Sequence, residues 1–354
     1  MDTVERSVDS PVEPPFLGTA TPGQEEIYEA KEQVSISPMR AALRRFLRDR
    51  RAVACLGIIL FIIAFSYIFP LFYIHMGPTL VDGLTGKKIG PEVYHNYTYS
   101  NLTYTGAPGT LFPFGPNSLA YPLGGDNIGR DMLARLMAGV NVSIEVALLV
   151  EVLDIGLGVL LGTLAGWYGG WLGTILDRFT DLVFAFPGIL LIILMGAALG
   201  PIFDNLFHGS VWGRIVLLTL AIGLLAWPLM MRYTRGATLQ LKEQQYVEAA
   251  KTNGTQTARI IFSHIVPNLL NLVVVAATLD ILTTIVGEAG LSVLGVGIRP
   301  PGSSLGLMIN DNLEAIYGVW TALFWPAFML VLLIVCFSFV GDGVRDAFDP
   351  RTKD

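Results

Sequence analysis

Long apolar stretches separated by short polar ones constrain this chain more than any other feature of its sequence. A bilayer core about 30 Å thick takes roughly 20 helical residues to cross. Six stretches are long and apolar enough, and we expect each to form a membrane-spanning helix: residues 52–74, 140–167, 182–199, 215–231, 269–286 and 319–340. Pro187, Pro228 and Pro326 lie inside three of them, where we expect each proline to kink its helix.

The composition agrees with a membrane environment. Only 15% of the 354 residues are charged, whereas about 25% are charged in a typical soluble domain. The net charge of -6 argues against binding to nucleic acid, which requires a basic surface. Cys55 and Cys336 both lie in apolar stretches, and we interpret them as small buried hydrophobic residues and not as a disulfide framework or metal site.

Basic residues predict the orientation, because loops rich in Lys and Arg stay in the cytoplasm. Residues 38–51 contain six arginines and predict a basic juxtamembrane helix on the cytoplasmic side. Residues 1–37 are polar and acidic, and we expect a disordered cytoplasmic tail. The transmembrane domain then covers 52–345, and six spans return the C-terminal tail, 346–354, to the cytoplasm. Its longest external loop, 76–135, forms either a small local fold over the pore mouth or an irregular lid.

A polar segment, residues 232–267, interrupts the apolar pattern between the fourth and fifth spans. Tyr246, Ala249 and Ala250 follow one another at i, i+3 and i+4, which places them on one face of a short helix. Gly254 is a residue typical of a helix end, and we expect a second helix to begin just after it. From the pattern alone, the segment either docks into a groove on another protein or lies on the membrane surface.

Acidic residues in or near the spans are further candidates for function. A charge at membrane depth costs about 2.5–3.5 kcal/mol on insertion scales, so such residues should face a cavity or a partner group. Asp280 lies deepest and is a candidate for the substrate path, with a structural hydrogen bond inside the bundle as the alternative. The full set is Glu145, Glu151, Asp154, Asp280 and Glu288.

Five stretches resemble the sequences of one transporter family. "EAAKTNGTQTARIIFSHIVPN" (248–268) resembles the EAA signature of ABC importer permeases. The others narrow the resemblance to the C-type permease of peptide and nickel importers. They are "GGDNIGRDMLARLMAGVNVSI" (124–144), "GWYGGWLGTILDRFTDLVFAFPGILL" (166–191), "EAGLSVLGVGIRPPGSSLGLMI" (288–309) and "GDGVRDAFDPR" (341–351). The resemblance covers 38–351; the acidic N-terminus and the enlarged first loop depart from it.

The resemblance implies an all-α, six-helix transmembrane domain of a type I ABC importer, with both termini in the cytoplasm. The chain would translocate di- or oligopeptides, or a related small solute, across the cytoplasmic membrane. Its partners would be a B-type permease subunit, two ABC ATPase subunits, an extracytoplasmic substrate-binding protein and membrane lipid. We expect no cofactor and no metal in this chain, because ATP and Mg would be bound by the ATPase subunits.

The resemblance also assigns roles to individual residues. The segment 232–267 would couple the permease to an ATPase. Within it, small Ala249 and Ala250 would permit close seating beside Tyr246, Glu248 would meet a basic group, and Gly254 would permit the turn back toward the membrane. Glu288 belongs to the 288–309 motif and would shape the external gate.

Other function classes are less well supported by the sequence. The chain lacks a phosphate-binding loop, since "GLTGKK" (83–88) has the wrong spacing, and it lacks the motifs of a hydrolase or metalloprotease. We therefore expect no enzymatic activity. The main alternative is an ion-coupled secondary transporter, which favours internal repeats and discontinuous helices, and no clear repeat is visible. The sequence does not indicate which cargo is carried.

Overall fold

The computed structural model describes residues 38–82, 85–101, 120–314 and 320–348. The chain divides into two compact units, Met1–Ala41 and Ala42–Asp354. Of the first unit, only the first turn of helix α2 (Pro38–Arg48) is described. The predicted disordered tail, 1–37, lies outside the described residues. All statements about packing below concern the second unit.

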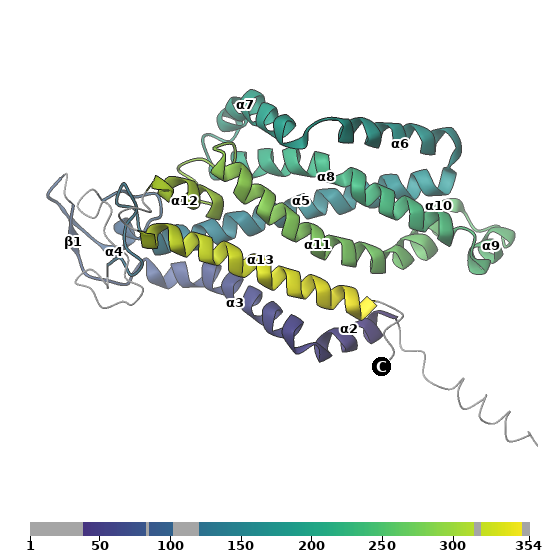
Figure 1. Cartoon of the computed structure of the whole chain (residues 1–354), viewed down its shortest axis with the longest axis horizontal. Coiled ribbons are helices and arrows are strands. Elements are labelled where there is room, and N and C mark those ends of the chain that lie inside the picture. Colours follow the sequence, from purple (N-terminus) through teal and green to yellow (C-terminus); the bar gives the residue numbers. More distant parts are fainter. Residues whose placement is uncertain (1–37, 83–84, 102–119, 315–319, 349–354) are drawn as a thin grey trace, which may run out of the picture. The chain divides into compact units, whose positions relative to one another are not determined.

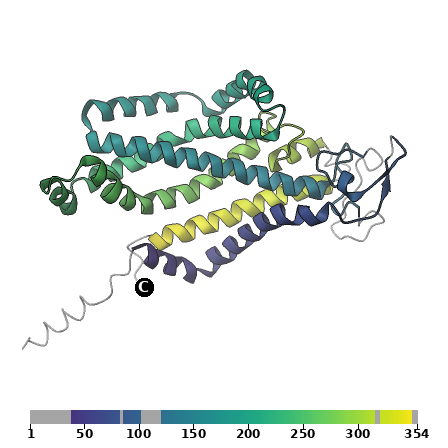
Figure 2. The same ribbon diagram turned by 180° about the vertical axis from the view of Figure 1, so that it is seen from behind.

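The second unit is built from long helices (Figures 1 and 2), so the predicted all-α membrane fold is confirmed. Five helical ranges in the described residues are long and apolar enough to cross a membrane. They are α3 (Arg50–Tyr73), α7 (Gly188–Leu206), α8 (Val211–Leu241), the continuous range Thr257–Val293 and α13 (Trp320–Phe348). The continuous range consists of α10 (Thr257–Ile260), the π-helix η2 (Ile261–Ile265) and α11 (Val266–Val293).

The remaining expected span, 140–167, lies within α5 (Met132–Tyr168). This helix has 37 residues, about 56 Å at 1.5 Å per residue, which is more than a bilayer core requires. It is not among the five ranges, so its crossing of the membrane stays a prediction. It packs along α8 in the most extensive helix–helix contact of the molecule.

The basic segment 38–51 is divided between two helices. α2 ends at Arg48, and α3 begins at Arg50. Asp49 separates them because its carboxylate accepts a hydrogen bond from Arg51 N at 2.9 Å and so caps the start of α3. At the other end of the chain, α13 continues to Phe348, so the first residues of the predicted C-terminal tail are helical.

The expected third span, 182–199, is broken in the structure. α6 (Gly170–Ala185) ends one residue before Phe186, and α7 begins after Pro187. The expectation of a kinked helix at Pro187 was wrong, because a residue that precedes proline is pushed out of the helical region, and Phe186 is extended with ψ of 137°. The span is therefore shifted to α7. Pro228 and Pro326 lie inside the unbroken helices α8 and α13.

A stripe of glycines brings α5 and α8 close together. Gly158, Gly162 and Gly166 recur at every fourth residue of α5, and all three are buried. A Cβ atom at Gly158 would lie 2.5 Å from Met230 Cβ, and one at Gly166 would lie 2.7 Å from Thr238 Cβ. Small residues at this spacing permit close approach of membrane helices.

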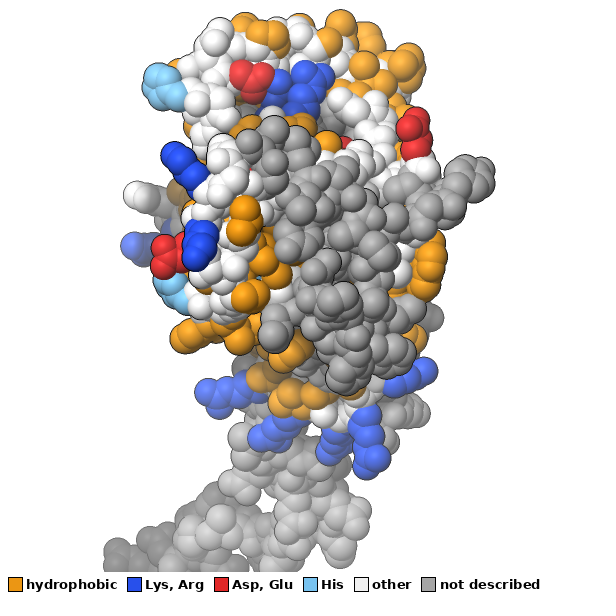
Figure 3. All heavy atoms as spheres, turned by 90° about the vertical axis from the view of Figure 1, so that its left-hand side faces the viewer, with side chains coloured by type: hydrophobic (Ala, Val, Ile, Leu, Met, Phe, Trp, Pro, Cys, Tyr) orange, Lys and Arg blue, Asp and Glu red, His pale blue; other side chains and the backbone are white. Residues whose placement is uncertain are grey.

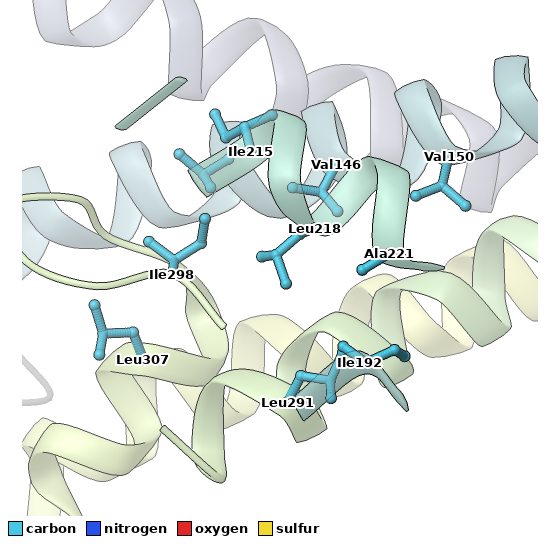
Figure 4. Close-up of a cluster of buried hydrophobic side chains, with 10 residues drawn as sticks. Val146, Val150, Ile192, Ile215, Leu218, Ala221, Leu291, Ile298 and Leu307 are labelled. Atoms are coloured by element: carbon cyan, nitrogen blue, oxygen red, sulfur yellow. The ribbon is translucent and has the colours of Figure 1, made fainter. Parts of the chain in front are cut away.

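An apolar cluster joins α5, α7, α8 and α11 to the segment around α12 (Leu305–Asn312) (Figure 4). Its buried members are Val142, Val146, Val150, Ile192, Ile215, Leu218, Ala221, Leu291, Ile298 and Leu307. A separate cluster holds Cys336, which is buried, and Cys55, which is half-buried. Both cysteines are free, in agreement with their interpretation as small hydrophobic residues.

The described part of the loop 76–135 contains a local fold. Strands β1 (Leu80–Val81) and β2 (Lys88–Ile89) pair antiparallel, and α4 (Pro91–Tyr94) follows. Buried His95 joins this part to the start of α5, since its Nδ1 lies 2.6 Å from Asp131 Oδ2. Figure 3 faces this end of the bundle, where acidic and basic side chains lie among apolar ones.

The predicted coupling segment lies at the opposite end of the bundle from β1 and α4. Helix α9 (Gln245–Thr252) projects there, beyond the end of α8 (Figure 1). This separation agrees with an arrangement in which α9 is cytoplasmic and the loop is external. The orientation in the membrane itself stays a prediction.

Candidate functional site

Val247, the fully buried residue of α9, packs this helix against the bundle. Its side chain is 0% exposed and packs in a cluster whose other buried members come from α8, α10, η2 and α11: Met230, Ile260, Ile265, Leu269 and Val273. Val247 is the only large aliphatic residue of α9, and that signal could have identified it from the sequence. Because burial of this side chain holds a short helix in place, α9 is positioned by packing.

The structure divides the predicted coupling residues between two faces of α9. Tyr246, Glu248 and Ala249 are exposed, whereas Ala250 is half-buried and packs against the cluster around Val247. Ala250 is therefore only partly available to a partner, and the docking role of Tyr246, Ala249 and Ala250 stays a prediction. The outward face comprises Gln245, Glu248, Ala249 and Thr252, which recur at helical spacing and are all exposed.

Two ring contacts support α9 from its sides. The ring centroids of Tyr246 and His264 are 6.1 Å apart. Lys251 Nζ lies 5.0 Å from the centroid of the Trp167 ring, near the end of α5, which is a cation–π distance. Glu248 has no ion pair within the described part of the chain. Its exposed carboxylate is thus available to a basic group on another protein.

The chain reverses direction after α9 at Gly254, as the sequence predicted. Gly254 has φ of 71°, in the left-handed region that glycine adopts at low cost. Thr255 N donates to Ala250 O at 3.1 Å, and Gly254 N donates to Lys251 O at 3.0 Å. These two bonds form a Schellman motif. α10 begins three residues later at Thr257, so the predicted second helix is confirmed.

Three of the five acidic candidates lie together between α5 and α11. Glu151, Asp154 and Asp280 each offer a carboxylate oxygen, and these oxygens lie within 4.8 Å of one another. Asp280 is half-buried. The sequence had singled out Asp280 for its depth, but nothing in the pattern indicated that the two α5 residues would meet it. Glu145 lies apart and accepts a hydrogen bond from Tyr67 Oη at 2.6 Å.

Glu288 occupies a different, fully buried position. It is 0% exposed and accepts hydrogen bonds from Ser143 Oγ at 2.8 Å and Ser292 Oγ at 2.7 Å. Ser304, the N-cap of α12, lies 3.2 Å from Ser292 through the two hydroxyl oxygens. Glu288 therefore joins α5, α11 and α12 and has no surface for cargo in this conformation. Its role in shaping an external gate stays a prediction.

A second buried network, which the sequence analysis missed, joins the start of α5 to α12. Arg135 NH1 lies 2.6 Å from Asp126 Oδ2, and Arg135 NH2 lies 2.8 Å from Asp311 Oδ2. Arg130 pairs with the same two carboxylates at 2.7 and 3.0 Å. Arg135 and Asp126 are both shielded from solvent. Two arginines thus balance two aspartates from distant parts of the chain.

Comparison with known proteins identifies relatives over most of the chain. Residues 158–354 match the family model described as "Binding-protein-dependent transport system inner membrane component". Residues 37–80 match the model for the "N-terminal TM domain of oligopeptide transport permease C".

Curated relatives have similar lengths. The chain is 36% identical over 331 residues to the oligopeptide transport system permease protein OppC of Salmonella typhimurium, covering 93% of this chain and 96% of the relative. It is 32% identical over 326 residues to the dipeptide transport system permease protein DppC of Bacillus subtilis, with 92% and 89% covered. Among solved structures, a chain of the inward-facing MetNI methionine ABC transporter matches with a TM-score of 0.48 and 22% identity, covering 61% of this chain and 97% of that one.

Proposed function

Since the chain belongs to the family of binding-protein-dependent transport system inner membrane components, we propose that it is the permease subunit of an ATP-driven ABC importer for di- and oligopeptides. The family and the five apolar helices make it a multi-pass protein of the cytoplasmic membrane. The peptide cargo is supported by the names of the relatives, which are oligopeptide and dipeptide permeases. The observation that carries the coupling role is α9, a packed helix with an outward face of small and polar residues.

The proposed importer contains further subunits. A B-type permease would complete the transmembrane part, two ATPase subunits would bind the cytoplasmic side, and an external binding protein would deliver the peptide. Hydrolysis of ATP would take place on the ATPase subunits, so that this chain is a non-catalytic subunit. Membrane lipid would surround the exposed apolar surface of the helices.

The proposed coupling passes from α9 into the membrane through α11. Closure of the ATPase dimer would push on the outward face of α9, which Val247 and the turn at Gly254 hold against the start of α10. From Thr257 the helical range continues to Val293, so displacement at one end can reach the membrane interior. Two arrangements of the bundle, biased by nucleotide and by the binding protein, would give alternating access.

A reconstitution experiment tests this function. We expect a tagged chain to co-purify with two ATPase subunits and a second permease. In proteoliposomes, the complex should take up a labelled dipeptide only when ATP and the binding protein are supplied. Uptake driven by an ion gradient without ATP, by a chain that binds no ATPase, would instead support the secondary transporter.

A change at the turn tests the role of α9. We expect Gly254→Val to lower the amount of peptide transported per ATP hydrolysed, because a β-branched residue in the left-handed region costs about 1–2 kcal/mol. Nothing lies within 4 Å of a Cβ atom at Gly254, so a clash contributes nothing. The measurement is the ratio of peptide uptake to phosphate release in proteoliposomes.

Gly254→Asn is the matched control, because asparagine tolerates the left-handed conformation. It should retain a ratio close to that of the unmodified complex, while both variants assemble in normal amounts. Equal ratios for the valine variant and the unmodified complex would contradict the role of this turn in coupling.

A further inference from the structure

The acidic group between α5 and α11 consists of Glu151, Asp154 and Asp280. The two helices pack directly on each other (Figures 1 and 2). Glu151 is 6% exposed and Asp154 is 2% exposed. Their side chains are therefore removed from solvent in the part of the molecule that crosses or adjoins the membrane.

The carboxylates of Glu151 and Asp154 lack the partners that buried charges require. Within the described residues, neither oxygen of Glu151 accepts a hydrogen bond, and Asp154 Oδ1 accepts none either. No Lys or Arg of the described chain forms an ion pair with any of the three acids. A buried carboxylate without a partner is costly. A cation held between the three acids would supply the partner that the carboxylates of Glu151 and Asp154 lack within the described residues.

The burial favours a small ion over a peptide. Only Asp280 is half-buried, so the amino group of a peptide would have to reach past the surrounding side chains to contact Glu151 and Asp154. A metal ion requires only a space between the oxygens. All three donors are carboxylate oxygens, which suit hard divalent cations such as Ca²⁺, Mg²⁺ and Mn²⁺.

The oxygens are close enough together for one cation to contact all three. They lie within 4.8 Å of one another, and two oxygens bound to one Ca²⁺ at about 2.3–2.6 Å can be up to about 4.6–5.2 Å apart. We propose that Glu151, Asp154 and Asp280 form a binding site for a divalent cation such as Ca²⁺ between α5 and α11. The site braces α11, the helix that leads to α9, against the pair formed by α5 and α8.

Equilibrium dialysis with ⁴⁵Ca²⁺ tests the site. The assembled complex, in lipid nanodiscs and without nucleotide or peptide, is first stripped of metal with a chelator. We expect the complex to bind one Ca²⁺ more than the same complex carrying Glu151→Gln and Asp154→Asn together. Asp280→Asn, which changes the half-buried member of the group, should weaken binding at least tenfold.

Glu145→Gln is the matched control, because it removes a carboxylate from the same helix outside the group. It should bind Ca²⁺ as the unmodified complex does. The proposal is overturned if the unmodified complex binds no more Ca²⁺ than Asp280→Asn, or if Glu145→Gln causes the same loss. If the double variant fails to assemble, the comparison of Ca²⁺ binding between Asp280→Asn and the unmodified complex still tests the proposal. Since neither cargo nor ATP is present, the result is independent of whether the complex imports peptides.

Discussion

Replacing Arg135 with alanine is expected to lower the free energy of unfolding by about 3–5 kcal/mol, the cost of breaking a buried ion pair by removing one partner. The guanidinium is 0% exposed and pairs with Asp126 and Asp311 at 2.6 and 2.8 Å. Without it, Arg130 alone faces two carboxylates, so one buried negative charge is left uncompensated. The consequence should be loss of the connection between the start of α5 and α12.

The measurement is unfolding of the purified chain in mixed micelles, followed by the loss of helical circular dichroism. Arg178→Ala is the control, since Arg178 forms an exposed pair with Asp181 at 3.6 Å, and such pairs contribute about 0–1 kcal/mol. Arg135→Lys should lower the free energy of unfolding by less than Arg135→Ala and by more than Arg178→Ala. Lysine keeps the charge, but it cannot pair with two carboxylates through a planar guanidinium. If Arg135→Ala lowered the free energy of unfolding no more than Arg178→Ala does, the network would contribute little to stability.

Much of the bundle was predictable because its helices correspond to long apolar stretches of the sequence. Hydropathy located all five confirmed ranges, although it placed the third 182–199 where the structure has α7 at Gly188–Leu206. That error arose because the residues on both sides of Pro187 are apolar, so a break inside them leaves the hydropathy unchanged. The restriction on the residue before proline contained the missing information, which Phe186 obeys.

The turn at Gly254 was predictable for a local reason, whereas the buried polar groups were not. Glycine adopts φ of 71° at little cost, so the sequence itself marks where α9 ends. By contrast, Arg135 pairs with Asp311, and the acidic residues Asp154 and Asp280 come together, only after distant helices have packed. The sequence shows that such charges must face a partner or a cavity, but which groups lie together depends on the three-dimensional arrangement.

The glycine stripe of α5 was only partly predictable from the sequence. Its period of four residues is visible in the sequence, and the same spacing is typical of close contacts between membrane helices. The partner could not be read from the pattern. In the structure it is α8, where Thr234 Oγ1 lies 2.8 Å from Gly158 O across the contact and 2.9 Å from Met230 O of its own helix. The short distance to Gly158 O requires the two backbones to approach closely, so the stripe contributes to the extensive contact between α5 and α8.

Gly162, the central glycine of the stripe, is the second position at which we expect a substitution to change stability strongly. We expect Gly162→Ala to lower the free energy of unfolding by about 3 kcal/mol, toward the upper end for overpacking of a core. An added Cβ would overlap the Thr234 hydroxyl and lie 2.5 Å from Met231 O and 3.0 Å from Arg235 N. Two of these atoms belong to the backbone of α8 and cannot rotate away, so α5 and α8 must separate and weaken the Thr234 hydrogen bond.

Gly156→Ala on the same helix distinguishes packing from helix propensity. Nothing lies within 4 Å of a Cβ atom at Gly156, and alanine is more favourable than glycine in a helix by about 1 kcal/mol. This variant should therefore unfold at the same or a higher denaturant concentration than the unmodified chain, whereas Gly162→Ala should unfold earlier. Since both changes add one methyl group to α5, similar stabilities for the two variants would mean that α5 and α8 are not held together by contact along this stripe.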